Sequence, residues 1–285
     1  MTRALVLSGG GPIGIGWHAG MIGALTDAGL GIADADLFVG TSAGAVVGAQ
    51  IALGLKPLDE MKRIVDVNPD SRYSASIGDN MQRLMALMAS DDMDPTERLR
   101  ALGALSLEAP TAPEENFVKR FDLSADGWPP RFVCTAIDIV DTTFVAWDAT
   151  ANVDTARAVA SSCSVPGFFP SVTINGRRYM DGGLRSITNA DLAAGHDRVL
   201  ILTLFEPPAE SPDLRAQRVR KVLDSELEAI ASKGGRSLVL APDAEAQVVI
   251  GVNLMDPTRA ADAAEAGYAQ GQRVTQRVTE LWDEA

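Results

Sequence analysis

Short apolar runs alternate with helical patterns over the first fifty residues of the chain. Residues 4–7 and 37–39 are continuous apolar runs, which are typical of strands buried on both faces of a parallel sheet. Between these runs, apolar side chains recur at helical spacing: Trp17, Met21, Leu25 and Ala28. Residues 45–54 are apolar nearly all round, as expected for a buried helix. The pattern predicts alternating strands and helices, with the strands parallel.

The stretch 56–125 shows no strand pattern. Pro57 begins one helix, and Asp94 begins another with a pattern like a capping box. Between them lies an apolar, methionine-rich group of residues: Met81, Leu84, Met85, Leu87 and Met88. This group is typical of ordinary helix core, which we favour, but it could also line a flexible acyl pocket or touch a membrane transiently. We expect residues 56–125 to form a helical cap inserted in one domain that spans residues 1–285.

Strand patterns return after residue 131. We expect strands over residues 132–139, 142–147, 172–174, 177–180, 199–205 and 237–240. We expect helices from Asp154 onward and over residues 211–233 and 257–283. The dipeptide Asn175-Gly176 predicts a tight hairpin turn. Together these elements predict a three-layer α/β/α fold with a mostly parallel central sheet and a helical cap.

The first strand runs into a glycine-rich loop, Ser8-Gly9-Gly10-Gly11-Pro12-Ile13-Gly14. Consecutive glycines before a helix present backbone N–H groups that can hold a phosphate or the oxyanion of an acyl-transfer intermediate. Gly9, Gly11 and Gly14 also satisfy the dinucleotide fingerprint, which requires an acidic residue at the end of the second strand. That strand ends in Gly40 instead. A nucleotide-binding protein that uses this loop is therefore the less favoured alternative.

The second strand leads into Gly40-Thr41-Ser42-Ala43-Gly44. A G-x-S-x-G pattern places its serine on a tight strand-to-helix turn, where glycines on both sides allow a close backbone approach. Gly-Thr-Ser is also an ordinary sequence for capping a helix, so the pattern alone leaves both interpretations open. We take Ser42 as the candidate nucleophile, with Gly40 and Gly44 as the glycines of the nucleophile elbow.

A third motif, Asp181-Gly182-Gly183, ends the second strand of the predicted hairpin. An acidic residue followed by two glycines at a strand end fits a catalytic loop, although Asp-Gly is equally common in turns. The three motifs together resemble the patatin-like phospholipase family, whose pattern is G-G-G-x-(Arg or Lys)-G, then G-x-S-x-G, then D-G-(Gly or Ala). The resemblance covers residues 3–54 and about 131–204, and it includes the segment from Ala158 to Pro170.

The resemblance implies a catalytic dyad that needs no histidine. Ser42 attacks an ester carbonyl, Asp181 accepts the serine proton, and the oxyanion hole is formed by the loop of Gly9, Gly10 and Gly11, with N–H groups of the last two as donors. One position departs from the family pattern, because Ile13 stands where a basic residue is usual. Without that cation a phosphate headgroup has one partner fewer, so neutral carboxylic esters or lysolipids become more plausible substrates.

The two histidines allow a competing mechanism. Ser42, Asp181 and His196 follow one another in the order of an α/β-hydrolase triad. His196 is in a predicted turn before the strand at 199–205, where a surface histidine needs no functional explanation. His18 follows the glycine loop and could shape substrate binding. We favour the dyad over the triad.

Composition limits the function further. The net charge of −13 and the pI near 4.6 argue against nucleic acid as a partner and against strong attraction to anionic membranes. Two cysteines and two histidines provide no pattern of metal ligands, so we expect neither a metal nor a cofactor. We find no signal peptide and no transmembrane run, and we expect a cytoplasmic protein. The oligomeric state is not predictable from these features.

The sequence therefore predicts a serine-dependent acyl-ester hydrolase with a lipid or other acyl ester as substrate, similar to a phospholipase, a lysophospholipase or an esterase. The alternative from another class is a catalytically silent relative that binds a lipid or a partner, which the replacement by Ile13 leaves open.

Overall fold

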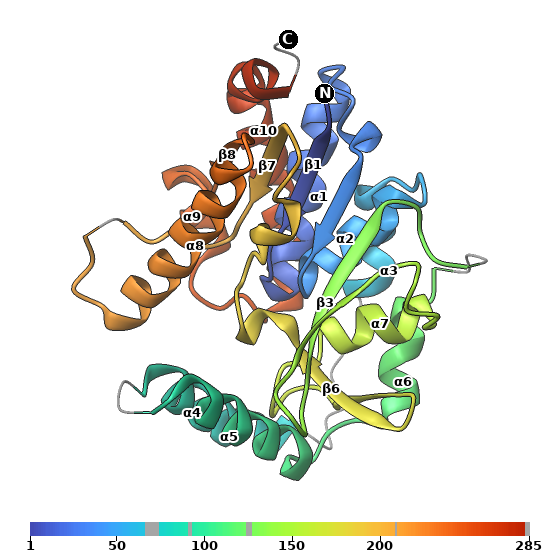
Figure 1. Ribbon diagram of the computed structural model, residues 1–285, viewed down its shortest axis with the longest axis vertical. Helices are drawn as coiled ribbons and strands as arrows, with labels where there is room; N and C mark the ends of the chain where they lie inside the picture. The colour runs from blue at the N-terminus through green and yellow to red at the C-terminus, as the bar shows by residue number, and fades with distance from the viewer. Residues whose placement is uncertain (66–73, 91–92, 124–126, 209, 283–285) are drawn as a thin grey trace.

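The computed structural model describes residues 1–285 except 66–73, 91–92, 124–126, 209 and 283–285 (Figure 1). Its strands are β1 (Arg3–Leu7), β2 (Leu37–Gly40), β3 (Phe132–Asp138), β4 (Phe144–Trp147), β5 (Val172–Ile174), β6 (Arg177–Asp181), β7 (Arg198–Leu202) and β8 (Arg236–Leu240). Its α-helices are α1 (Gly11–Asp27), α2 (Ala43–Ala52), α3 (Pro57–Val65), α4 (Ser74–Ala89), α5 (Pro95–Glu108), α6 (Glu114–Val118), α7 (Thr155–Ser162), α8 (Leu214–Ser232), α9 (Ala244–Ile250) and α10 (Ala260–Trp282). The 3₁₀ helices are η1 (Ile32–Asp34), η2 (Lys119–Phe121), η3 (Gly182–Leu184), η4 (Ala190–Ala193) and η5 (Pro257–Arg259). The pattern of the sequence did not predict α9.

The strands form one mixed sheet. Among the described residues it has eight strands, in the order β5-β6-β3-β2-β1-β7-β8, with β4 also paired to β3. The central strands β3, β2, β1, β7 and β8 are parallel, whereas β4, β5 and β6 run antiparallel to their neighbours. Leu7 of β1 pairs with Gly40 of β2 and with Leu202 of β7, so these three strands finish together. The predicted mostly parallel sheet is confirmed.

Alternating side chains give the sheet two covered faces. Leu5 and Leu7 of β1 join the cluster that contains buried residues of α1, α2 and α10. Ala4 and Val6 of the same strand join the cluster that contains η4 and Ile230 of α8. Successive residues of a strand point to opposite faces, so one strand serves both layers of helices. The chain therefore has the three-layer α/β/α arrangement (Figure 1).

Glycines allow α1 and α10 to pack closely. A Cβ atom on Gly20 would lie 2.0 Å from the carbonyl oxygen of Ala264, and one on Gly267 would lie 2.4 Å from that of Trp17. The Nε1–H of Trp17 also donates to Oε1 of Gln270 at 3.1 Å. Glycine inside a helix weakens it, and here the contact between the two helices accounts for its presence.

The helices between residues 56 and 125 pack on different parts of the fold. α3 packs on α1, and α6 packs on α7. α4 and α5 lie side by side at the lower end of Figure 1, where Leu102 and Leu105 of α5 contact the cluster of Ile137 in β3 and Met180 in β6. These helices form the helical cap of the fold. The extent of the cap as one insertion over 56–125 stays a prediction.

The methionine-rich part of α4 divides among three environments, and in one of them Met85 is exposed to solvent. Leu84, Leu87 and Met88 pack in the cluster of Leu102 and Leu105, as expected for helix core. Met81 instead lines a cavity, described below, as an acyl pocket would require. Within the ranges that the structure describes, no helix combines the length and the apolar character needed to cross a membrane.

Gly20→Ala should destabilise the protein by about 1–3 kcal/mol, because its Cβ would overlap the Ala264 carbonyl. Gly78→Ala is the matched control, since no atom lies within 4 Å of its Cβ position and alanine favours a helix. Urea denaturation of both variants checks this prediction. Equal stability would contradict the close contact between α1 and α10.

Candidate active site

Ser42 occupies the turn between β2 and α2. Its backbone has φ 52° and ψ −117°, a positive φ that a residue with a side chain rarely adopts. A Cβ on Gly44 would lie 2.0 Å from the carbonyl oxygen of Leu7, and one on Gly40 would lie 2.5 Å from the Cα of Ala45. Glycine is therefore required on both sides of Ser42, where the sequence pattern places it.

Three polar side chains that sequence reasoning missed hold this turn. The backbone N–H of Ser42 donates to Oγ of Ser162, at the end of α7, over 2.9 Å. Next to it, Oγ1 of Thr41 accepts a hydrogen bond from Nδ2 of Asn189 over 3.0 Å and lies 3.1 Å from Oγ1 of Thr135. All of these side chains are buried. The turn is fixed from behind by hydrogen bonds that bring together four separate segments of the chain.

Asp181 lies at the end of β6, beside Ser42. It is 4% exposed, its Oδ1 accepts the N–H of Gly183 at 2.7 Å, and the side chain of Ser42 lies near enough to favour its charged form by hydrogen bonding. Burial raises the pKa of Asp181 from 3.8 to about 7, although these two hydrogen bonds lower it in part. The fold thus brings two predicted site residues, far apart in the sequence, into direct contact.

The glycine loop lies against Ser42. A Cβ built on Gly9 would lie 3.5 Å from the Cβ of Ser42. The N–H of Gly9 donates to the carbonyl of Ile187 at 2.9 Å, so this group is already occupied. For the N–H groups of Gly10 and Gly11, at the start of α1, no hydrogen bond is found within the described part of the chain. Only these two members of the predicted loop have N–H groups available for an oxyanion.

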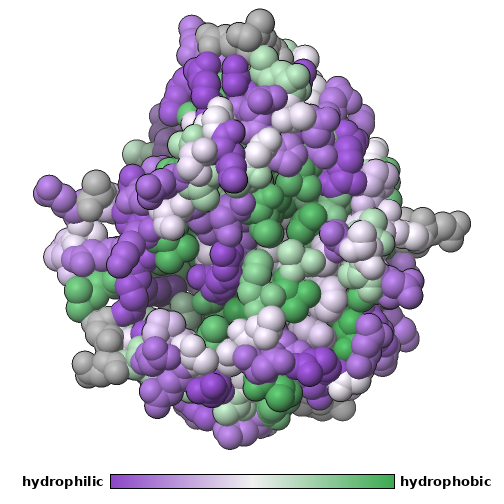
Figure 2. Space-filling model, viewed as in Figure 1, coloured by the Kyte–Doolittle hydropathy of each residue, from purple (hydrophilic) through white to green (hydrophobic). Residues whose placement is uncertain are grey.

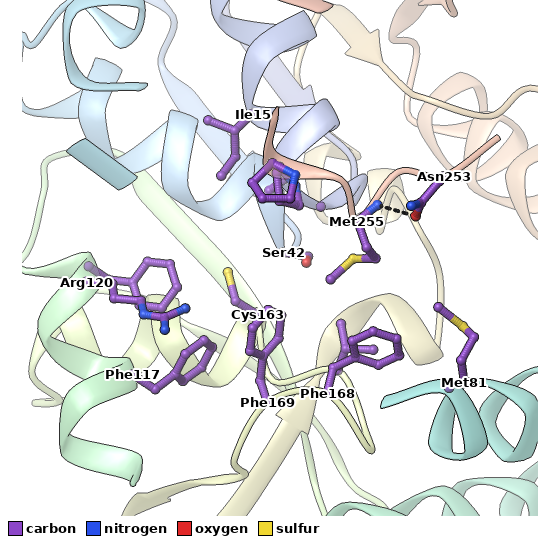
Figure 3. Close-up of a pocket in the computed structure, with 17 residues that line it drawn as sticks. Ile15, Ser42, Met81, Phe117, Arg120, Cys163, Phe168, Phe169, Asn253 and Met255 are labelled. Atoms are coloured by element: carbon purple, nitrogen blue, oxygen red, sulfur yellow. Dashed lines mark hydrogen bonds between the residues drawn. The ribbon is translucent and has the colours of Figure 1, made fainter. Parts of the chain in front are cut away.

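Ser42 opens into a cavity of about 540 Å³ with a largely apolar lining (Figure 3). Its described lining residues are Gly11, Pro12, Ile15, Ser42, Ala43, Gly78, Met81, Phe117, Arg120, Phe121, Cys163, Val165, Phe168, Phe169, Asn253, Met255 and Pro257. They come from both ends of the chain, from the helical cap and from the segment that follows α7. In Figure 2, hydrophobic residues gather in the middle of the face that Figure 1 presents. A cavity of this size and lining suits an apolar chain.

Cys163 lies in the same cavity, next to the two candidate residues. Burial, together with the charge of Asp181, raises the pKa of its thiol well above the usual value, although a hydrogen bond with the Ser42 side chain lowers it in part. A thiol in that state is neutral and a poor nucleophile. Its nearness to Ser42 had no signal in the sequence.

Neither histidine is placed to complete a triad. His196 precedes β7 and therefore lies at the amino ends of the parallel strands, whereas Ser42 follows the carboxyl end of β2. Its Nδ1 is 3.1 Å from the carbonyl oxygen of Ala193. His18 is fully buried, and burial lowers its pKa to about 3, so it is neutral. His18 is also not among the residues that line the cavity.

The part of the chain that the structure describes contains no cluster of three or more His, Cys, Asp or Glu side chains suited to a metal ion.

Comparisons with known proteins agree with this architecture. A family model described as patatin-like phospholipase matches residues 5–194, more than half of the chain. The chain therefore belongs to the patatin-like phospholipase family, a class of lipid acyl hydrolases. A search of curated proteins finds no match.

Two solved structures are similar over nearly the whole chain. VipD from Legionella pneumophila is 17% identical with a TM-score of 0.48, and the match covers 97% of this chain and 67% of VipD. The type III effector protein ExoU is 17% identical with a TM-score of 0.41, and the match covers 97% of this chain and 53% of ExoU. This chain thus spans about half the length of ExoU.

Ser42→Gly should be more stable than Ser42→Ala by about 1–2 kcal/mol, because glycine adopts the observed φ of 52° without strain. Both substitutions remove the hydroxyl, so the comparison isolates the backbone. Thermal unfolding of the two variants at one pH measures the difference. Equal midpoints would contradict a strained turn.

Asp181→Asn should stabilise the protein at pH 8. Folding raises the pKa of Asp181 from 3.8 to about 7, so the folded state disfavours the charged carboxylate. The protein therefore loses stability as the pH rises from the unfolded pKa through the folded pKa of about 7. A shift of this size corresponds to at most about 4 kcal/mol, and we expect a gain of roughly 1–4 kcal/mol. Denaturation in urea at pH 8 and pH 5 should show the gain shrinking at the lower pH.

Asp148→Asn provides a control of opposite sign. Hydrogen bonds from Thr150 lower the pKa of Asp148, so its charged form is favoured by folding and the asparagine variant should lose stability at pH 8. If Asp181→Asn instead destabilised the protein at pH 8, the charged carboxylate would be favoured by folding, which would contradict the raised pKa of Asp181.

Proposed function

We propose that this protein is a serine-dependent acyl-ester hydrolase in which Ser42 is the nucleophile and Asp181 is the base. One observation carries the proposal: the side chain of Ser42, at the wall of an apolar cavity, adjoins the buried carboxyl of Asp181 and favours its charged form. A serine hydroxyl is a weak nucleophile at neutral pH and needs an adjacent base. The family to which the chain belongs agrees with a lipid as the source of the ester.

The first half of the reaction acylates the serine. As Oγ of Ser42 attacks the ester carbonyl carbon, its proton passes to the carboxylate of Asp181. The carbonyl oxygen becomes an oxyanion and accepts the free N–H groups of Gly10 and Gly11, donors that typically contribute two to three orders of magnitude in rate. The tetrahedral intermediate then collapses, the bond to the alcohol breaks, and the leaving alkoxide takes the proton from Asp181.

The second half repeats these steps with water. Asp181 accepts a proton from a water molecule that attacks the acyl carbon, and the intermediate expels Oγ of Ser42, which recovers the proton. The carboxylic acid product leaves and the dyad is restored. A base works best when its pKa lies near the working pH, so the pKa of about 7 suits Asp181 to both proton transfers.

The cavity supports an acyl chain as the group that is bound. Its aromatic wall is ordered: the rings of Phe117 and Phe169 stack with centroids 4.8 Å apart, and Phe121 meets Phe117 edge-on at 5.1 Å. Opposite them, Met81 and Met255 contribute flexible side chains that adapt to chains of different length. We therefore propose esters of medium or long acyl chains as substrates.

Ser42→Ala and Asp181→Asn should each lower the release of p-nitrophenol from acyl esters of graded length by at least about a thousandfold, because each removes one half of the dyad. His196→Ala should retain the wild-type rate, since His196 lies at the other end of the strands. Circular dichroism of each variant establishes that the fold is intact.

Two results would contradict this assignment. Strong loss of activity in a folded His196→Ala protein would require a histidine base. Absence of turnover at every chain length, with no reaction of the wild-type protein toward a serine-directed phosphonate, would instead favour a relative that binds a lipid without cleaving it.

A further inference from the structure

One charged side chain lies in the otherwise uncharged cavity. Among the described lining residues, Arg120 of η2 alone carries a formal charge. It is half-buried, and burial lowers the pKa of its guanidinium, yet an arginine stays protonated at neutral pH. A cation in an apolar cavity is costly unless a partner compensates the desolvation of its charge.

Within the described residues, no acidic side chain acts on Arg120, and the contact it has is with an aromatic ring. In those parts of the chain no carboxylate forms an ion pair with it, and its guanidinium carbon lies 5.8 Å from the ring centroid of Phe117. That ring is held between Phe121 and Phe169. The aromatic residues therefore position the guanidinium without neutralising it, so its N–H donors remain available to an anion.

Arg120 is on one side of the candidate nucleophile. Figure 3 shows Arg120 and Phe117 on one side of Ser42, and Met81, Met255 and Asn253 on the other. An ester bound with its carbonyl at Ser42 has two branches, the acyl chain and the alcohol. The two sides of the cavity can each take one branch, and the side with Arg120 can take a branch that ends in an anion.

Among the described residues that line the cavity, no other side chain is a cation. The glycine loop from Gly9 to Gly14 contains no Lys or Arg, and Ile13 within it is fully buried in the core, away from the cavity lining. The net charge of −13 also repels an anion in general. A negatively charged substrate would therefore depend on Arg120 for its binding.

We propose that Arg120 binds an anionic group, a phosphate or a carboxylate, carried by the acyl ester that Ser42 cleaves. This inference rests on the proposed hydrolase function and adds a substrate class to it, that of anionic lipid esters. The guanidinium presents a planar pair of donors that matches either anion in a bidentate contact. Neutral esters would bind through the apolar walls alone.

Matched substrates test this binding. One pair is 1-dodecanoylglycerol 3-phosphate and 1-dodecanoylglycerol, which differ in the headgroup phosphate. The other pair is the p-nitrophenyl monoester of a dicarboxylic acid and that of the monocarboxylic acid of equal length, which differ in a carboxylate at the end of the acyl chain. Arg120→Gln should lower kcat/KM roughly 10- to 100-fold for the anionic member of one pair and less than twofold for its neutral partner.

Two further variants separate charge from shape. Lys119→Gln removes the same charge from the neighbouring exposed side chain, which does not line the cavity, and should change neither substrate's rate by more than twofold. Arg120→Lys keeps the charge and should recover part of the loss. An equal loss for anionic and neutral esters in Arg120→Gln, or no loss in either pair, would overturn the proposal and leave Arg120 as a packing residue.

A binding measurement keeps the test independent of turnover. Calorimetric titration of the wild-type protein and of Arg120→Gln with dodecyl phosphate, below its micelle concentration, should show at least tenfold weaker binding in the variant. Equal affinities would overturn the proposal even if esters are hydrolysed. If the wild-type protein binds dodecyl phosphate through Arg120 but cleaves no ester, the hydrolase function fails while the anion site is supported.

Discussion

The site depends on a backbone constraint at one residue. Ser42 has a φ of 52° because β2 must turn sharply into α2, and Gly40 and Gly44 permit the turn since a side chain at either would overlap backbone atoms. Two hydrogen bonds hold the turn in place: the N–H of Ser42 donates to Oγ of the buried Ser162, and the buried Asn189 donates to Thr41. The strained backbone is thus compensated by the parallel sheet and the helices behind it.

A second constraint follows from the position of Ser42 beside the buried carboxyl of Asp181. The hydroxyl of Ser42 faces Asp181, and the burial that brings the two together also raises the pKa of the carboxyl to about 7. The same desolvation that makes the carboxylate a usable base makes it unfavourable for folding at higher pH. Stability and the proposed chemistry are therefore opposed at this residue, and the burial of its carboxyl is the common cause.

Most strands and the turns at the site could be predicted from the sequence, because they depend on local patterns of residues. The apolar runs predict the strands, and glycine spacing around Ser42 and after Asp181 predicts where the turns fall. The contributions of Ser162 and Arg120 could not be predicted, since each reaches the site by tertiary packing and its neighbours in sequence form no motif. The helix Ala244–Ile250 escaped detection because it has only 7 residues, too few to show a helical period.

The central claim is that Ser42 is a nucleophile activated by Asp181. The most direct test is the rate at which a fluorophosphonate labels the protein between pH 5 and pH 9, with the labelled peptide identified by mass spectrometry. We expect one adduct, on Ser42, whose rate of formation rises with pH through an inflection near 7 as Asp181 loses its proton. Labelling of another residue, or a rate on Ser42 that is independent of pH and unchanged in Asp181→Asn, would contradict it.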